Sequence, residues 1–285
     1  MAGRTEANSF EISRRAALIG AASVAGIGGA FAQSLSVDAP ADAHGAALAG
    51  SNRSPNNRAR DRWRAPRESL SFFGIQPNHT VVEILPGSVG YWLEILAPYL
   101  KDKGKYVAGG RGEEEKRESY IVDHDRLLAK LAADPATYGK VEVTRFNPTT
   151  RVAAPDASAD FVLTFRNLHN WIDRDQIEGA LEAFRKALKP GGVLGVSDHR
   201  GRTDMSQDAQ MKSGYIRQDY AIALIEKAGF KLAGTSEAKA NPKDTKDHPA
   251  GVWTLPPSYR LKDQDREKYA AIGESDRFLL KFVKA

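Results

Sequence analysis

The segment from residue 80 to residue 96 constrains the fold more than any other part of the chain. A short apolar run ends at Glu83, and apolar residues at helical spacing begin at residue 91, after a loop that contains Pro86, Gly87, Ser88 and Gly90. This order predicts a β-strand, a glycine-containing turn and a helix start. The backbone there can approach a ligand closely, and a carboxylate at the strand end can bind ribose hydroxyls. The segment therefore predicts a site for a nucleotide-like ligand.

Runs of strand length and runs of helical length alternate along the chain after residue 80. Such alternation predicts an α/β fold of the Rossmann-like, doubly wound type, with helices on both faces of a mostly parallel sheet. The expected strands cover residues 80–83, 105–108, 141–146, 160–165, 193–197, 231–237 and 277–283. Ligands bind such sheets beyond the carboxyl ends of the strands, so we expect the functional site at that edge.

The first 32 residues have the order of an export signal. Arg14 and Arg15 precede a mildly apolar, glycine-containing stretch, and residues 30–32 read Ala-Phe-Ala, a small-x-small cleavage pattern. Adjacent arginines with a weakly hydrophobic stretch are typical of a twin-arginine signal; the alternative is an uncleaved anchor helix. We expect residues 1–32 to be a signal peptide that engages the twin-arginine export machinery. The mature protein is then periplasmic or secreted, without stable membrane insertion.

The remaining composition sets the domain organisation and excludes several classes of function. Residues 33–57 contain few large apolar side chains, which predicts a flexible linker, and residues 58–285 are expected to form one domain. The chain has no cysteine, which excludes disulfides and thiolate chemistry. Its 41 basic and 36 acidic residues are intermixed without a basic stripe, so nucleic acid is not expected as a partner.

Several short segments carry a resemblance to a known family. Residues 188–194 read Leu-Lys-Pro-Gly-Gly-Val-Leu before the fifth strand, residues 228–230 read Ala-Gly-Phe, and residues 276–282 form an apolar closing strand. Together with residues 83–90 they resemble class I S-adenosylmethionine-dependent methyltransferases. The resemblance implies S-adenosyl-L-methionine as cofactor, methyl transfer to a small-molecule acceptor, and a seven-stranded sheet with an antiparallel last strand.

Shorter motifs are similar to a narrower bacterial group of exported, predicted methyltransferases. These motifs are Phe-Phe-Gly-Ile at residues 72–75, Arg-Asn-Leu-His-Asn-Trp at 166–171, Asp-His-Arg at 198–200, and the stretches 240–244 and 251–253. The resemblance covers nearly all of residues 58–284.

Two departures from the family pattern bear on the cofactor. The glycines expected two, four and six positions after the first acid are replaced by Leu85, Gly87 and Val89, with Gly90 one step later. The second strand ends in Gly-Gly-Arg where the family usually offers an acid to the ribose, and Glu113 is the nearest acid. Either Glu83 and Glu113 share that role, or the ribose is held in another way.

The exits of the fourth and fifth strands carry the candidate catalytic residues. Arg166 is expected to contact the cofactor, and Asn167 to act near the acceptor, since this fold brings acceptor and donor together there. His169 and His199 are candidate general bases, because imidazole titrates near neutral pH. With Asp198 the two histidines also permit a metal site, although the spacing matches no local metal motif and no metal is expected.

Three further predictions concern the surroundings and the class of function. Residues 123–125 read Asp-His-Asp, but they fall inside an expected helix and are interpreted as surface. Residues 241–253 are expected to form a lid over the cleft. The main alternative to an enzyme is an exported, non-catalytic ligand-binding protein on the same scaffold, and a nicotinamide-dependent oxidoreductase is disfavoured by the loop chemistry.

Overall fold

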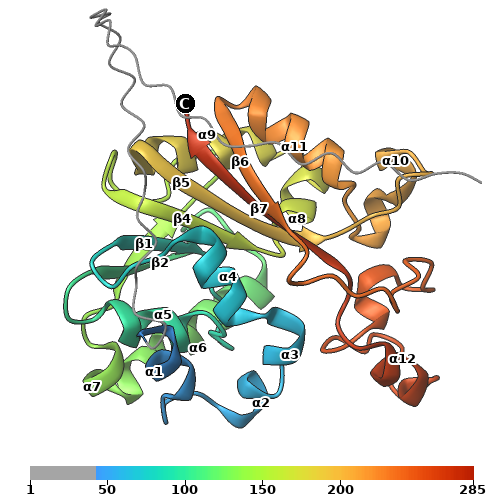
Figure 1. Cartoon of the computed structure of the whole chain (residues 1–285), viewed down its shortest axis with the longest axis horizontal. Coiled ribbons are helices and arrows are strands. Elements are labelled where there is room, and N and C mark those ends of the chain that lie inside the picture. Colours follow the sequence, from blue (N-terminus) through green and yellow to red (C-terminus); the bar gives the residue numbers. More distant parts are fainter. Residues whose placement is uncertain (1–42) are drawn as a thin grey trace, which may run out of the picture. The chain divides into compact units, whose positions relative to one another are not determined.

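A computed structural model describes residues 43–285, which belong to one compact unit (Figure 1). The predicted signal peptide and the first part of the predicted linker lie outside the described residues. None of the described helices is long and apolar enough to cross a membrane.

The centre of the unit is a seven-stranded sheet in the order β3-β2-β1-β4-β5-β7-β6. Its strands are β1 Thr80–Ile84, β2 Lys105–Arg111, β3 Glu142–Phe146, β4 Ala159–Phe165, β5 Leu188–His199, β6 Phe230–Ser236 and β7 Arg277–Lys284. Strands β1 to β5 pair in parallel, whereas β7 is antiparallel to both β5 and β6. This topology confirms the predicted Rossmann-like sheet with its antiparallel last strand.

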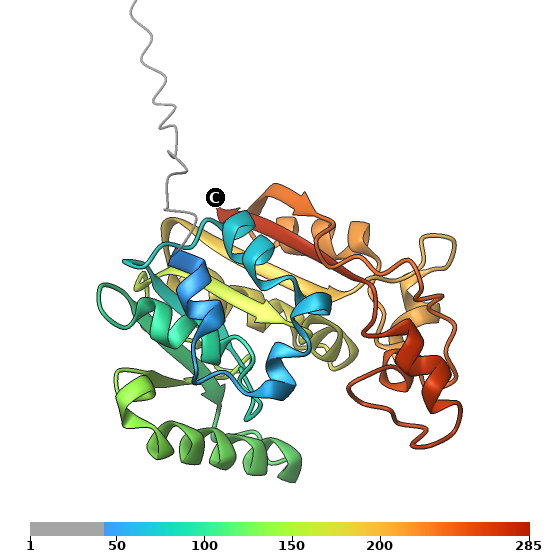
Figure 2. The same cartoon turned by 60° about the horizontal axis from the view of Figure 1, so that its bottom comes forward.

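Helices cover both faces of the sheet (Figures 1 and 2). Side chains alternate along each strand, so Val81 of β1 packs with one apolar cluster and Val82 with the other. The first cluster includes helices α1 Ala43–Ala49, α4 Pro66–Phe73, α5 Leu93–Leu100 and α6 Glu118–Ala133, and the second includes α8 Leu168–Asp173, α9 Ile177–Ala187 and α11 Gln218–Lys227. The remaining helices are α2 Pro55–Arg58, α3 Asp61–Arg64, α7 Pro135–Tyr138, α10 Gln207–Gln210, α12 Arg266–Ile272, η1 Met211–Ser213 and η2 Gly251–Thr254.

Residues 43–57 are part of the folded unit, so the prediction of a flexible linker is wrong for them. Ala47 of α1 is buried in the core, and the Arg53 guanidinium pairs with the Asp61 carboxylate at 2.6 Å. Glu94 of α5 accepts hydrogen bonds from Ser54 N and Asn57 Nδ2, at 3.0 and 2.8 Å. The segment is poor in large apolar residues, yet polar contacts with α5 hold it in place.

The Lys-Pro-Gly-Gly segment leaves the ladder between β4 and β5. Leu188 pairs with Ala159, and the next paired residue of β5 is Val193, opposite Phe161. Gly191 has φ +72°, a conformation that favours glycine. The predicted turn is therefore present as an irregularity at the start of β5, and the strand beyond it ends at His199.

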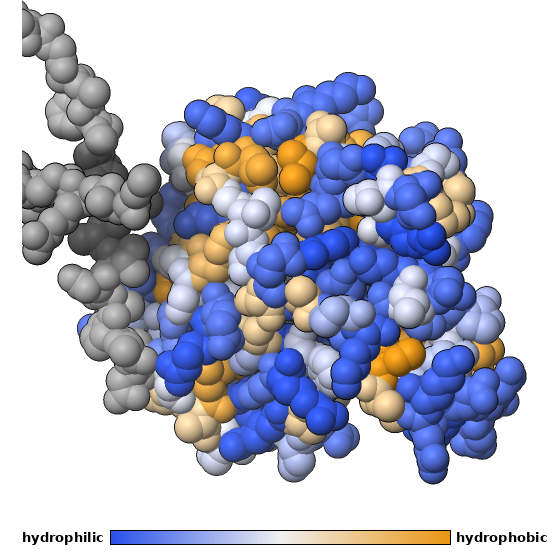
Figure 3. All heavy atoms as spheres, turned by 45° about the vertical axis from the view of Figure 1, so that its right-hand side comes forward, coloured by the Kyte–Doolittle hydropathy of each residue, from blue (hydrophilic) through white to orange (hydrophobic). Residues whose placement is uncertain are grey.

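The segment between β6 and β7 lies beyond one end of the sheet, where Figures 1 and 2 show α12. Because β7 is antiparallel to β5, Arg277 at the start of β7 is paired with His199 at the end of β5. This segment thus stands at the carboxyl ends of the parallel strands. Hydrophilic residues predominate on the face of the molecule in Figure 3.

Candidate functional site

A cleft of about 350 Å³ lies at the carboxyl ends of β1, β4 and β5. The sheet order reverses between β1 and β4, and ligands of doubly wound folds bind at such a switch point. A neighbouring cavity of about 310 Å³ shares Leu85, Arg111 and Tyr120 with the cleft and extends past β2 and β3. The two cavities together offer room for an elongated ligand.

The loop after β1 forms one wall of the cleft. Pro86, Gly87 and Ser88 line it, whereas Gly90 is buried beside Leu93 at the start of α5. Leu85 has φ +51° and Gly87 has φ +68°. The family pattern has glycine at the position of Leu85, whereas this chain has a larger side chain there in a left-handed conformation. Such strain costs on the order of 1–3 kcal/mol and gathers at functional sites.

Asp123 of α6 contacts the loop after β1 through Ser88. Its Oδ1 accepts hydrogen bonds from Ser88 N at 2.9 Å and from Ser88 Oγ at 2.5 Å. The side chains of Asp123 and His124 both line the cleft. The interpretation of residues 123–125 as plain surface is therefore wrong for these two. The helix was predicted, but which of its faces meets the loop depends on how α6 packs.

Neither acid that was expected to hold the ribose lies in the cleft. Glu83 is 3% exposed and accepts a hydrogen bond of 2.5 Å from Tyr106 Oη. Burial raises the pKa of Glu83 to about 7, against the lowering effects of Tyr106 and of Arg64 and Arg166. Glu113 is exposed and pairs with Arg145 at the β3 edge of the sheet. Their positions do not fit the alternative in which these two acids share the ribose, so the alternative that the ribose is held in another way stays open. Asp123 is the carboxylate that the fold brings to the loop.

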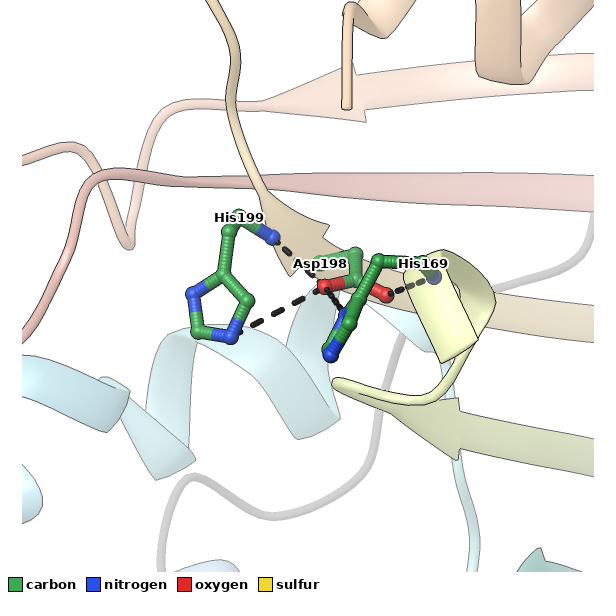
Figure 4. Close-up of side chains that lie close together, drawn as sticks. All are labelled: His169, Asp198 and His199. Atoms are coloured by element: carbon green, nitrogen blue, oxygen red, sulfur yellow. Dashed lines mark hydrogen bonds and ion pairs between the residues drawn. The ribbon is translucent and has the colours of Figure 1, made fainter. Parts of the chain in front are cut away.

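His169, Asp198 and His199 lie together at the ends of β4 and β5 (Figure 4). Asp198 is fully buried, and its Oδ1 lies 2.9 Å from His169 Nδ1. The Asp198 carboxylate also accepts hydrogen bonds from the backbone N–H groups of His169 and His199, at 3.2 and 2.8 Å. Burial by itself raises the pKa of Asp198, but the interactions with His169 and His199 outweigh it and lower the value to about 2.

An ionised Asp198 settles the tautomer of His169. The carboxylate can only accept, so the proton of the His169 ring resides on Nδ1 and leaves Nε2 as the basic nitrogen. Both histidines line the cleft, so the state of each ring decides between them. His199 places Nδ1 at 2.5 Å from Ser275 Oγ, and burial lowers the pKa of His199 well below its usual value. His169 is therefore the better placed of the two candidate bases.

The same three residues also satisfy the spacing of a metal site, because their ligand atoms lie within 4.8 Å of one another. Two observations favour proton transfer over cation binding. Both carboxylate oxygens of Asp198 already accept hydrogen bonds from protein donors. Arg166 and Arg277 also stand close enough to lower the pKa of His199 further, and positive charge there repels a metal cation.

Asn167 and Arg166 follow β4 and line the cleft. Asn167 Nδ2 donates to Ile84 O at 3.2 Å and to Thr164 Oγ1 at 3.3 Å, so it links the ends of β1 and β4. Arg166 has φ +62° and donates its backbone N–H to Ser197 O at 2.8 Å. Its Nε is buried without a hydrogen-bond partner among the described residues.

The segment between β6 and β7 forms the wall opposite the β1 loop. Val252 and Trp253 line the cleft, and the Trp253 ring lies 6.0 Å from the His169 ring in a T-shaped arrangement. Asp244 anchors the segment by accepting from Tyr215 Oη, Asp276 N and His248 Nε2, each at 2.8 Å. Residues 241–253 therefore build a braced wall at the cleft, in the place where a lid was expected.

Comparison with known proteins supports the fold. No protein-family model matches the sequence, and no curated protein is similar to it. Two solved structures resemble the chain with a TM-score of 0.53. One is a SAM-dependent methyltransferase from Aquifex aeolicus, with 17% identity over 82% of this chain and 95% of that chain. The other is the [4+2]-cyclase SpnF, with 15% identity over 83% of this chain and 84% of that chain. At these identities the similarity establishes that the chain has the Rossmann-like fold seen in methyltransferases.

Proposed function

We propose that this protein is an S-adenosylmethionine-dependent methyltransferase that acts on a small-molecule acceptor. The observation that carries the proposal is the composition of the cleft, which has the β1 loop on one side and the Asp198–His169 pair on the other. The fold of the Aquifex aeolicus methyltransferase supports it. Since a [4+2]-cyclase has a similar fold, the fold alone does not establish methyl transfer.

The β1 loop and α6 would hold the cofactor. A Cβ atom at Gly87 would lie 3.2 Å from Asp123 Oδ2 and one at Gly110 would lie 2.8 Å from the His124 ring, so the two glycines let α6 pack close against the loop and against β2. Ser88 uses Oδ1 of Asp123, and Oδ2 stands beside Gly87. This second oxygen is the acceptor that we assign to the ribose hydroxyls.

When bound, S-adenosylmethionine supplies an electrophilic methyl group. The protein's task is to orient the acceptor and exclude water. We call the part of the cleft lined by Phe165, His169 and Trp253 the acceptor half, because the acceptor would bind there. Phe165 and Trp253 give it apolar surface. His169 Nε2 can take a proton from an acceptor hydroxyl or amine, while Asp198 keeps the ring oriented and stabilises its protonated form.

Gly87→Val tests the cofactor site. The valine side chain meets Asp123 in a backbone conformation that disfavours β-branched residues. We expect S-adenosylhomocysteine, titrated by calorimetry, to bind the native protein and not the variant, while circular dichroism shows that the variant is folded. Gly191→Val is the matched control, because Gly191 also has positive φ but has open space around its Cβ position.

A native protein that binds neither S-adenosylmethionine nor S-adenosylhomocysteine at millimolar concentration would overturn the proposal. The scaffold would then belong to a non-catalytic ligand-binding protein, which is the alternative from the sequence.

A further inference from the structure

Five cationic side chains gather beside the acceptor half of the cleft. Arg64, Lys239 and Arg277 are each less than 5% exposed, and Arg60 and Arg166 lie next to them. We refer to Arg60, Arg64, Arg166, Lys239 and Arg277 as the cationic cluster. They come from α3 and the residue before it, the end of β4, the segment after β6 and the start of β7, so more than 200 residues separate the outermost members in the sequence.

Ion pairs among the described residues balance only part of the cluster's positive charge. The carboxylates of Glu83 and Asp198 act on Arg64 and Arg166 from a longer distance, without an ion pair. Within the described part of the chain, Glu274 is the only carboxylate that forms an ion pair with any member, at 2.6 Å from Arg60, 3.5 Å from Arg64 and in close contact with Arg277. Arg166 and Lys239 form no ion pair there. Arg64 Nη2 and Arg166 Nε are buried without hydrogen-bond partners among the described residues.

The lowered pKa values of two members agree with this excess of positive charge. Burial, followed by the charge of Arg277, lowers the pKa of Arg166 to about 10. Burial, followed by the charges of Arg277 and Arg64, lowers the pKa of Lys239 well below its usual value. Buried cations without counter-charges are costly, so an anion bound beside them would be strongly favoured.

Two members of the cluster face the cleft. Arg166 and Arg277 both line it, as does Glu274. Arg277 pairs with His199 across β5 and β7, on the side of β4 away from β1. The Gly87 loop that we assign to the cofactor follows β1. The part of the cluster that lines the cleft is thus next to the candidate base rather than next to the cofactor loop.

Building on the proposed function, we propose that the methyl acceptor carries an anionic group, a carboxylate or a phosphate, that binds Arg166 and Arg277. Each guanidinium presents a planar set of donors that matches two oxygens of such a group. Glu274 neutralises part of the cluster and is the group with which an incoming anion competes. The anion would anchor the acceptor so that its nucleophilic atom lies near His169.

Inorganic phosphate is the probe for this site. We expect it to bind the full-length protein in calorimetric titrations at constant ionic strength, with acetate binding more weakly and chloride giving no saturable signal. Arg166→Gln should weaken phosphate binding about tenfold, the loss typical of one charge-assisted hydrogen bond. Arg151→Gln is the control, because Arg151 is half exposed and pairs with Glu182 away from the cleft. Equal affinity in the native protein and Arg166→Gln would overturn the inference.

Glu274→Gln gives a test in the opposite direction. The substitution removes the competing carboxylate, so phosphate should bind about tenfold more tightly. General damage to the fold would weaken binding instead. Arg277→Gln should lose phosphate binding. If that variant does not fold, Arg166→Gln, with weaker binding, and Glu274→Gln, with tighter binding, still test the site.

A second titration separates the acceptor's anion from the carboxylate of the cofactor. Phosphate should bind equally well with saturating S-adenosylhomocysteine, which has a carboxylate, and with saturating 5′-methylthioadenosine, which has none. Loss of phosphate binding with S-adenosylhomocysteine alone would mean that the arginines hold the cofactor, which overturns the inference and leaves the proposed function standing. Phosphate binding by a protein that does not bind S-adenosylhomocysteine would overturn the proposed function and leave the anion site.

Discussion

Glu83 lies in the interior of the sheet with Tyr106 as its hydrogen-bond partner. Burial raises its pKa from 4.5 to about 7. Below pH 4.5 the carboxyl is neutral in both the folded and the unfolded chain. As the pH rises towards 7, the unfolded chain loses this proton first, so Glu83 progressively destabilises the fold. Above pH 7 the full cost applies, about 3 kcal/mol.

Glu83→Gln should therefore stabilise the protein in a pH-dependent way. Glutamine keeps an acceptor for Tyr106 Oη and carries no charge. We expect urea unfolding to show a gain of up to about 3 kcal/mol at pH 8 and almost none near pH 4.5. A gain of the same size at both pH values would mean that packing, and not the buried charge, explains it.

Val89 stands in the loop after β1 at a position where the family pattern has glycine. It is 57% exposed, and its carbonyl accepts hydrogen bonds from Asn57 Nδ2 at 3.0 Å and Lys130 Nζ at 3.2 Å. These contacts hold the backbone, and the exposed side chain is part of the cleft lining.

For Val89→Gly we expect an unchanged affinity for S-adenosylhomocysteine, with a loss of stability of about 0.5–1 kcal/mol from the added freedom of the unfolded chain. Calorimetric titration and urea unfolding measure the two effects separately. A large loss of affinity would show that the Val89 side chain itself contacts the cofactor.

At the scale of elements, Glu94 joins three helices of one face. This carboxylate of α5 is 1% exposed and accepts from Asn57 Nδ2 of α2 and from Lys130 Nζ of α6, at 2.8 and 2.6 Å. α6 in turn presents Asp123 to the loop after β1. The positions of the loop and of the helices before β1 are therefore linked through one buried acid.

Glu94→Ala should destabilise the protein by about 3 kcal/mol, because it leaves buried donors without partners. Asp125→Ala on the exposed side of α6 is the control and should change stability by less than about 0.5 kcal/mol. The midpoints of urea unfolding compare the two. Similar small effects would mean that α1 and α2 are held mainly by apolar contacts.

The strands of the sheet and most of the long helices that cover it were predictable, because their apolar periodicity is local. Helices α1 and α2 were not, since residues 43–57 are ordered by polar contacts with α5 rather than by an apolar face of their own. The role of Asp123 was missed for a related reason. Its place in a helix was clear, but its partner Ser88 lies 35 residues away.

At the scale of the whole molecule, the route to its compartment stays a prediction from residues 1–32. Replacing Arg14 and Arg15 by lysine keeps the positive charge and removes the arginine pair that the twin-arginine machinery reads. We expect the precursor to accumulate in the cytoplasm, as measured by fractionation and blotting. Normal export of the variant would indicate the general secretory route.

The order of residues was sufficient to establish the α/β class and the edge of the sheet where ligands bind, because strand and helix periods and turn residues are properties of short segments. The antiparallel last strand was expected from the resemblance to methyltransferases alone. It also placed His169, His199 and Asn167 at that edge. The Asp198–His169 pair, the carboxylate of Asp123 and the cationic cluster depended on the assembled molecule. Packing brings α3, the end of β4 and the start of β7 together across more than 200 residues, and only that packing determines which charges meet without water between them.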